Sequence, residues 1–166
     1  MSRIAPVAVA LDGPDLATIT AWAGAAGPHV STMKVDLETY LRDGDAAVHA
    51  AREASGGRDV FLDLKLHDIP NTVRGAAAAA AATGAELLTV HATGGEAMLR
   101  AAVEGAATAG RGTRVVAVTL LTSLDAGAMP PGFARPFDLG ETIAALLETA
   151  ERAGALGIVC SAADLV

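Results

Sequence analysis

The side chains best suited to chemistry are the charged groups of the segment 63–70, DLKLHDIP. Asp63, Lys65 and Asp68 follow an apolar stretch of strand length, where packing alone gives no reason for charged residues. Successive side chains of a strand point to opposite faces. We therefore expect Asp63 and Lys65 to share one face, which is free for chemistry, and the neighbouring leucines to pack on the other.

The chemistry expected of this segment is proton donation beside repelling acids. A lysine flanked by aspartates is expected to keep its positive charge, so Lys65 would be an acid poised to donate. Two unit charges about 4 Å apart near a protein surface interact by roughly 4 kcal/mol, so a substrate carboxylate placed beside Asp63 would be pressed to leave. A solvated salt bridge at a strand end is the alternative interpretation. The further presence of Asp68, and of Lys34 after the preceding strand, favours a functional site.

These side chains must be positioned by a repeating pattern of strands and helices. Longer segments with helical spacing, such as 16–26 and 139–150, separate short apolar runs. The strands are predicted at Ile4–Leu11, Val30–Val35, Val60–Leu66, Glu86–His91, Arg114–Leu121 and Gly157–Cys160. Near-continuous apolar strands joined by helices indicate a parallel sheet covered by helices.

The polar residues at the strand ends distinguish between a barrel and an open sheet. Each of the six predicted strands ends in a polar side chain: Asp12, Lys34, Asp63 with Lys65, His91, Thr122 and Ser161. In a (β/α)8 barrel all strands deliver their last residues to one mouth, whereas an open sheet gathers its ligand groups at one switch point. The sequence therefore predicts an α/β fold, a (β/α)8 TIM barrel of which about the first six strands are present.

The helices and loops fit the same plan. Asp45 is a candidate N-cap for a helix through Ala54, which Gly56-Gly57 would end. The alanine run 76–82 is predicted to be a helix packed against the sheet and stopped at Gly84. The segment 123–136, rich in glycine and proline, is a candidate lid at the mouth.

Length and charge set limits on what this chain does. Its 166 residues suit one domain, 1–166, but a closed barrel of eight strands takes about 250 residues, so we expect a partial barrel with two sheet edges left to cover. A formal net charge of −7 argues against nucleic acid or an anionic membrane as a partner. The sequence shows neither a signal-peptide pattern nor a long apolar span, which favours a cytoplasmic protein. With one cysteine, Cys160, an internal disulfide is excluded.

The segment 63–73, DLKLHDIPNTV, resembles the signature of the orotidine 5'-phosphate decarboxylase family. The resemblance runs through the whole chain in order. Its other parts are Ala10-Leu11-Asp12, Met33-Lys34-Val35, Val90-His91-Ala92-Thr93-Gly94-Gly95, Val118-Thr119-Leu120-Leu121-Thr122-Ser123 and Val159-Cys160-Ser161. This family resemblance implies decarboxylation of orotidine 5'-monophosphate to UMP in de novo pyrimidine biosynthesis, on a (β/α)8 barrel and without a metal or organic cofactor.

The resemblance also implies a role for each matching residue. Lys65 would protonate the ring carbon that loses carbon dioxide, and Asp63 would lie against the departing carboxylate while holding Lys34 and Lys65. Asp12 and Lys34 would bind ribose hydroxyls. Thr122 or Ser123 would contact the base. The resemblance also implies a homodimer with shared sites, in which three residues reach the active site of the second subunit: Asp68, Ile69 and Thr72.

One part of the family pattern has no counterpart here, namely the phosphate grip that follows strands seven and eight. We therefore expect residues 1–166 alone to bind nucleotide poorly and to be inactive or nearly so. Two alternatives stay open. One is a magnesium-dependent sugar-phosphate lyase or decarboxylase of the same superfamily, which shares the Asp-x-Lys-x-x-Asp core, although the continuation 69–72 favours the nucleotide enzyme. The other is a non-catalytic remnant that only dimerises.

Overall fold

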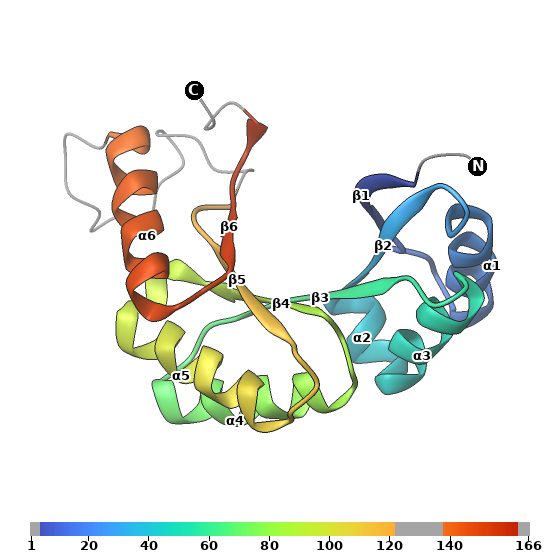
Figure 1. Ribbon diagram of the computed structural model, residues 1–166, viewed down its shortest axis with the longest axis horizontal. Helices are drawn as coiled ribbons and strands as arrows, with labels where there is room; N and C mark the ends of the chain where they lie inside the picture. Colours follow the sequence, from blue (N-terminus) through green and yellow to red (C-terminus); the bar gives the residue numbers. More distant parts are fainter. Residues whose placement is uncertain (1–3, 122–137, 163–166) are drawn as a thin grey trace.

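A computed structural model describes residues 4–121 and 138–162. Six strands alternate with helices along the chain (Figure 1). The strands are β1 Ala5–Ala10, β2 Val30–Asp36, β3 Asp59–Leu66, β4 Leu87–His91, β5 Arg114–Val118 and β6 Gly157–Val159. The helices are α1 Leu16–Ala26, α2 Leu37–Asp43, α3 Asp45–Ala54, α4 Pro70–Ala82, α5 Glu96–Thr108 and α6 Leu139–Ala153, with a 3-10 turn, η1, at Ala92–Gly94.

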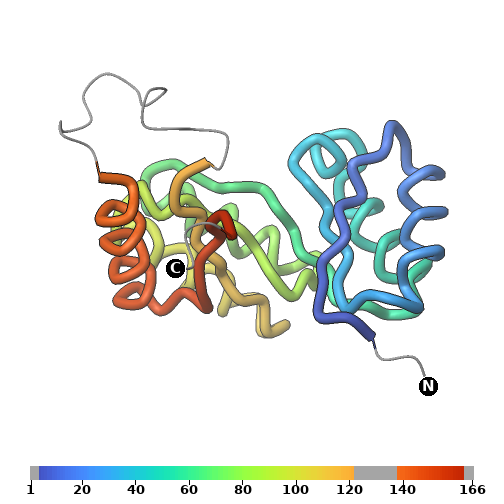
Figure 2. Tube along the Cα trace, turned by 90° about the horizontal axis from the view of Figure 1, so that it is seen from above, coloured from blue at the N-terminus to red at the C-terminus, as the bar shows by residue number. Residues whose placement is uncertain are grey.

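The six strands form one parallel sheet whose spatial order, β1-β2-β3-β4-β5-β6, is the order of the chain. A doubly wound sheet would reverse its order at a switch point, and this one does not. The sheet curls, with α1 to α3 at one end, α4 and α5 beneath its middle and α6 at the other end (Figure 1, Figure 2). This is the arrangement of successive units of a (β/α)8 barrel, as predicted.

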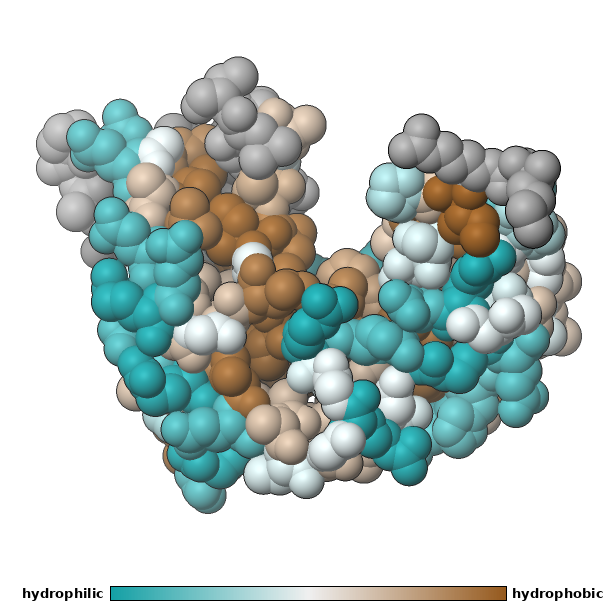
Figure 3. Space-filling model, viewed as in Figure 1, coloured by the Kyte–Doolittle hydropathy of each residue, from teal (hydrophilic) through white to brown (hydrophobic). Residues whose placement is uncertain are grey.

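The sheet is curled but not closed. β1 and β6 are its two edge strands, and no pairing joins them within 4–121 and 138–162. A hollow separates the arm that carries β1 and β2 from the arm that carries β6 and α6, and apolar surface gathers on the second arm (Figure 3). Leu147 and Leu156, both of that arm, are among the exposed large apolar side chains. Within the described residues, both sheet edges are unpaired, as expected.

The core lies between the sheet and its helices and is built from small and branched side chains. Leu62 is fully buried, and Leu64 and Leu66 pack against the core, as the alternation along β3 predicts. The alanine run does form the end of a helix, α4, with a positive φ of 87° at Gly84 just beyond it. Gly105 of α5 lies so close to α4 that an added Cβ would overlap the Arg74 carbonyl, so only glycine permits this close packing of the two helices.

Two sequence predictions need correction. Asp45 is the first residue of α3 and makes no cap; Gly44, with a φ of 59°, occupies the cap position because α2 ends only one residue earlier. The Asp45 carboxylate instead accepts a hydrogen bond from the Tyr40 hydroxyl. β5 ends at Val118 and does not reach Leu121, although the Thr119 amide and hydroxyl still donate to the Val159 carbonyl.

Candidate active site

Four charged side chains meet where β1, β2 and β3 end, and we call Asp12, Lys34, Asp63 and Lys65 the strand-end cluster. The Lys65 ammonium lies 2.8 Å from Asp63 Oδ2. Lys34 Nζ lies 3.5 Å from the same oxygen and 3.6 Å from Asp12 Oδ1. Positive and negative groups therefore alternate along the cluster, from Asp12 to Lys34 to Asp63 to Lys65.

The parallel register explains this convergence. β1 and β2 are aligned so that Ala10 is opposite Lys34, and β2 and β3 so that Asp36 is opposite Asp63. Residues at the carboxyl ends of adjacent parallel strands lie at one edge of the sheet, so charged side chains distant in sequence become neighbours.

Asp63 is the buried centre of the cluster, with a side chain only 12% exposed. Burial by itself raises the pKa of the Asp63 carboxyl. Hydrogen bonds from Lys65 and Thr89, together with the positive charges of Lys65 and Lys34, outweigh burial, so the pKa lies below its ordinary value. Asp63 therefore carries its negative charge at neutral pH between two ammonium groups.

Lys65 has an unusual backbone. Its φ of 51° makes it the one non-glycine residue with positive φ among the described residues. For a residue other than glycine, this left-handed backbone conformation costs about 1–3 kcal/mol. It persists only where the surrounding structure imposes it, commonly at functional sites. The Lys65 side chain is 37% exposed and its ammonium pairs with Asp63, so a bound molecule has access to this side chain.

Two histidines border the cluster. His91 ends β4, His67 follows β3, and their ring centroids are 5.3 Å apart. Burial, followed by the charges of His67 and Lys65, lowers the pKa of His91, while Asp63 opposes this. Gly94 lies close to both Met98 and His67: an added Cβ would overlap the Met98 side chain and lie 3.3 Å from the His67 ring. His91 therefore lies near enough to Lys65 and Asp63 for their charges to act on it.

Other predicted site residues do not join the strand-end cluster. Asp68, Ile69 and Thr72 are exposed, and Ile69 is 66% exposed. The Asp68 carboxylate accepts the Ile69 amide N–H at 2.6 Å and makes no ion pair within the described part of the chain. Thr122, Ser123 and the candidate lid 123–136 lie outside the described residues.

Two residues of the site were missed by sequence reasoning. Thr89, fully buried in β4, donates its hydroxyl to Asp63 Oδ1 at 2.8 Å. Asp36 caps α2 by accepting the Thr39 amide N–H; burial raises the pKa of its carboxyl, but the Thr39 hydrogen bonds and the charge of Lys34 lower it more. A threonine within the apolar run LLTV was the available signal for Thr89, because a buried hydroxyl requires a partner.

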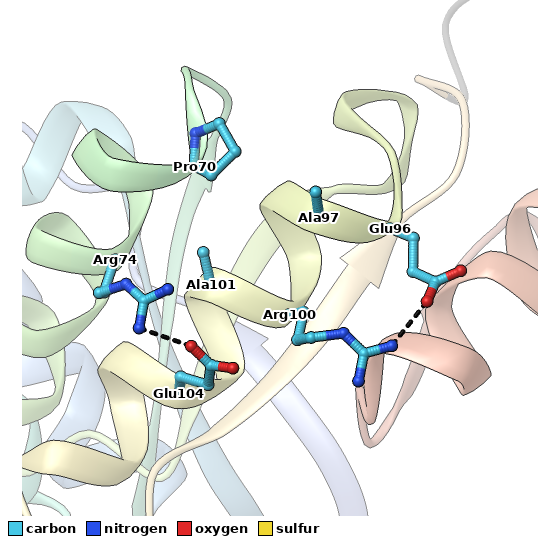
Figure 4. A pocket seen from close by; sticks show the side chains of 7 residues that line it. All are labelled: Pro70, Arg74, Glu96, Ala97, Arg100, Ala101 and Glu104. Carbon is cyan, nitrogen blue, oxygen red and sulfur yellow. Dashed lines mark hydrogen bonds and ion pairs between the residues drawn. The ribbon is translucent and has the colours of Figure 1, made fainter.

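A second group of charges lies on the outer helices, and we call Arg74, Glu96, Arg100, Glu104 and Arg152 the helix-face cluster. All of its members except Arg152 line a surface pocket of about 490 Å³ between α4 and α5 (Figure 4). Arg74 pairs with Glu104 at 2.5 Å, and Arg100 with Glu96 at 2.6 Å. Arg152 of α6 also reaches Glu96, at 3.0 Å. These side chains are between 39% and 55% exposed.

Residues 4–121 and 138–162 contain neither a candidate metal site nor a candidate membrane-spanning helix. No group of three or more His, Cys, Asp or Glu side chains there is arranged to hold a metal ion. No helix there is long and apolar enough to cross a membrane.

A curled parallel β/α sheet with charged groups gathered at its strand ends defines the class, a protein of the β/α-barrel type with a candidate catalytic site at the mouth. Residues 5–165 match the model of the Orotidine 5'-phosphate decarboxylase / HUMPS family. The chain belongs to this family.

Curated relatives and solved structures agree with the family match. The chain is 54% identical over 156 residues to the orotidine 5'-phosphate decarboxylase of Anaeromyxobacter sp. (strain K), covering 93% of this chain and 66% of that protein. It thus spans slightly less than two thirds of that relative. Among solved structures, an uncharacterized conserved protein from Geobacillus kaustophilus superimposes with a TM-score of 0.83 at 39% identity, covering 96% of this chain and 75% of the other. The orotidine 5'-phosphate decarboxylase of Lactobacillus acidophilus gives 0.78 at 33% identity, covering 95% and 71%.

Proposed function

We propose that this chain carries the reacting groups of an orotidine 5'-monophosphate decarboxylase, a carboxy-lyase that forms UMP and carbon dioxide in pyrimidine biosynthesis. The observation that carries the proposal is the Lys65 ammonium held 2.8 Å from the buried Asp63 carboxylate, with Lys34 on the same oxygen. The similarity to relatives known as orotidine 5'-phosphate decarboxylases supports the choice of substrate.

Lys65 acts as the acid. The bond between ring carbon C6 and the carboxylate carbon breaks, carbon dioxide leaves, and the electron pair stays on C6. This carbanion has no enolate to spread into, so a fixed neighbouring cation must stabilise it. Lys65 Nζ then gives a proton to C6, which yields UMP and a neutral amine that regains its proton from water.

Asp63 favours the loss of carbon dioxide by acting on the substrate carboxylate. Its low pKa keeps it ionised, so it repels a substrate carboxylate placed against it and is relieved when carbon dioxide departs. It also fixes Lys65, and fixed charges avoid reorganisation during the reaction. Asp12 and Lys34, at the outer end of the cluster, bind the ribose hydroxyls. Thr122 or Ser123 contacts the base.

The active unit is a homodimer with shared sites. Asp68, Ile69 and Thr72 extend from the segment after β3 and the first turn of α4 into the site of the second subunit. What supports this is their exposure, together with the absence of an ion pair at Asp68 in the described chain. Ile69 is 66% exposed, so its apolar side chain is free to contact a second subunit.

The reaction uses neither a metal nor an organic cofactor, and the protein works in the cytoplasm on free nucleotide, without nucleic acid or membrane. The magnesium-dependent sugar-phosphate lyase is the rival to be tested. Activity that persists in excess chelator supports the nucleotide enzyme, whereas loss of activity on chelation and its recovery with Mg²⁺ would support the rival.

The deciding experiment measures UMP formation from orotidine 5'-monophosphate by two polypeptides. One is residues 1–166, and the other is the full-length protein, meaning the whole reading frame that contains them. We expect turnover by the full-length protein and little or none by residues 1–166 alone. A full-length protein that binds no nucleotide and forms no UMP would overturn the proposal, and efficient turnover by residues 1–166 would overturn the expectation of inactivity.

A further inference from the structure

The pairing of β3 with β4 is interrupted beside the strand-end cluster. Leu62 is opposite Leu88 and Leu66 is opposite Val90, so three residues of β3 face one residue of β4. That single residue is Thr89. Bulges of this kind re-aim side chains and are common next to active sites.

The interruption changes where the Lys65 backbone finds its hydrogen bond. With its φ at 51°, Lys65 turns its amide away from the regular ladder, and the N–H donates to Thr89 Oγ1 at 2.8 Å. Leaving this partly buried amide without a partner would cost free energy, so the threonine hydroxyl supplies the acceptor that the ladder does not. The left-handed backbone of Lys65 is thereby held by a side chain from the next strand.

The same hydroxyl also fixes Asp63. Thr89 Oγ1 donates its proton to Asp63 Oδ1 at 2.8 Å, while Asp63 Oδ2 accepts from Lys65. Thr89 is fully buried, and its bond to Asp63 is shielded from water. A hydroxyl has one proton to donate and lone pairs to accept with, and here both capacities are used.

We propose that Thr89 is a positioning residue, whose hydroxyl locks the Lys65 backbone and the Asp63 carboxylate in one arrangement for proton transfer to the substrate. This inference rests on the proposed decarboxylase function. Thr89 does not touch the reacting atoms and acts only through Asp63 and Lys65. Its effect falls mainly on kcat, because the geometry of the acid is altered while Lys34 keeps its ion pair with Asp12 for binding ribose.

The test compares Thr89→Val with Thr89→Ser in the full-length protein. Valine keeps the shape and removes the hydroxyl, and serine keeps the hydroxyl and removes the methyl group. We expect Thr89→Val to lower kcat about 10- to 100-fold with KM changed less than about threefold, the size expected for a misplaced catalytic group. Thr89→Ser should stay within about threefold of the parent kcat, even though the lost methyl group lowers its melting temperature.

Thr113→Val is the matched control. The Thr113 hydroxyl is also buried and donates to the Ala85 carbonyl at 2.6 Å, but it precedes β5, at the end of the sheet away from the cluster. We expect this variant to lose melting temperature and keep kcat. An equal loss of kcat in Thr89→Val and Thr113→Val, or a parent kcat in Thr89→Val, would overturn the proposal.

A titration separates this inference from the proposed function. Carbon-13 NMR of the Asp63 carboxyl should show its pKa rising in Thr89→Val and unchanged in Thr89→Ser, because the hydrogen bond from Thr89 helps to lower it. If the parent protein forms no UMP but the titration follows this pattern, the proposed function fails and the positioning by Thr89 stands. If Thr89→Val does not unfold cooperatively, Thr89→Ser decides, and a tenfold loss of its kcat would refute the inference.

Discussion

The strand-end cluster and the helix-face cluster contain the same kinds of side chain but lie in different surroundings. Asp63 is 12% exposed and has partners on both oxygens, whereas Glu104 and Arg74 of the helix-face cluster are 48% and 51% exposed. Exposed ion pairs contribute about 0–1 kcal/mol because water screens them. Alternating charges are therefore no sign of function by themselves. The strand-end cluster differs from the exposed ion pairs because Asp63 is buried and Lys65 has a left-handed backbone.

The largest difference between the clusters should appear when their cations are removed. Lys65→Ala should lower kcat of the full-length protein by about 10⁴-fold or more, since it removes both the proton donor and the cation that stabilises the carbanion. Binding of UMP, measured by calorimetry, should remain detectable. Arg74→Ala is the matched change in the helix-face cluster and should leave kcat within about twofold. Substantial turnover by Lys65→Ala would remove this lysine from the mechanism.

The contribution of the Asp63 carboxylate to the free energy of unfolding should depend on pH. Because the folded pKa of Asp63 is lowered, its ionised form stabilises the fold fully above the ordinary unfolded value of about 3.9. This contribution is lost as the pH falls from there through the folded pKa. Urea unfolding between pH 7 and pH 3 should therefore show a decline in the free energy of unfolding that is smaller in Asp63→Asn. Parallel declines in the parent and in Asp63→Asn would show that Asp63 is not held ionised.

The backbone at Lys65 gives a smaller but more specific contrast. Glycine tolerates a positive φ and alanine does not, so Lys65→Gly should be about 1 kcal/mol more stable than Lys65→Ala. Val116, on the regular pairing of β4 with β5, should give the opposite order, with glycine about 0.5–1 kcal/mol less stable than alanine. Chemical denaturation of the four variants checks both signs. The same order at both positions would argue against the left-handed conformation of Lys65.

The smallest effect is expected in the helix-face cluster. Glu104→Gln removes the charge that pairs with Arg74 and should change the free energy of unfolding by less than about 1 kcal/mol. High salt should reduce even this difference, because exposed pairs are screened. A loss of more than about 2 kcal/mol would mean that the pair is more shielded than its exposure indicates.

Much of the architecture could be predicted from local sequence. The starts of β2 and β5 match the predicted apolar runs, and the four residues predicted at helical spacing, Leu16, Ile19, Ala23 and Ala26, all lie in α1. Asp15 caps α1 by accepting the Thr18 amide N–H. The prediction for Asp45 was wrong because the spacing between two helices, not residue preference, decides which residue becomes the cap. Local patterns fix the type of an element more firmly than its ends.

The sequence by itself determined that Asp63 and Lys65 lie on one face of a strand and that six strand and helix units follow one another. Only the tertiary structure decided the distance at which Lys34 approaches Asp63. It also decided that Thr89, 26 residues further along the chain, donates a hydrogen bond to the second oxygen of the Asp63 carboxylate. The reason is that strand alternation is a property of neighbouring residues, whereas register and bulges depend on how two distant segments pair. The left-handed backbone at Lys65 also depends on the pairing of distant segments, because nothing in the segment 63–66 requires it until β4 is in place.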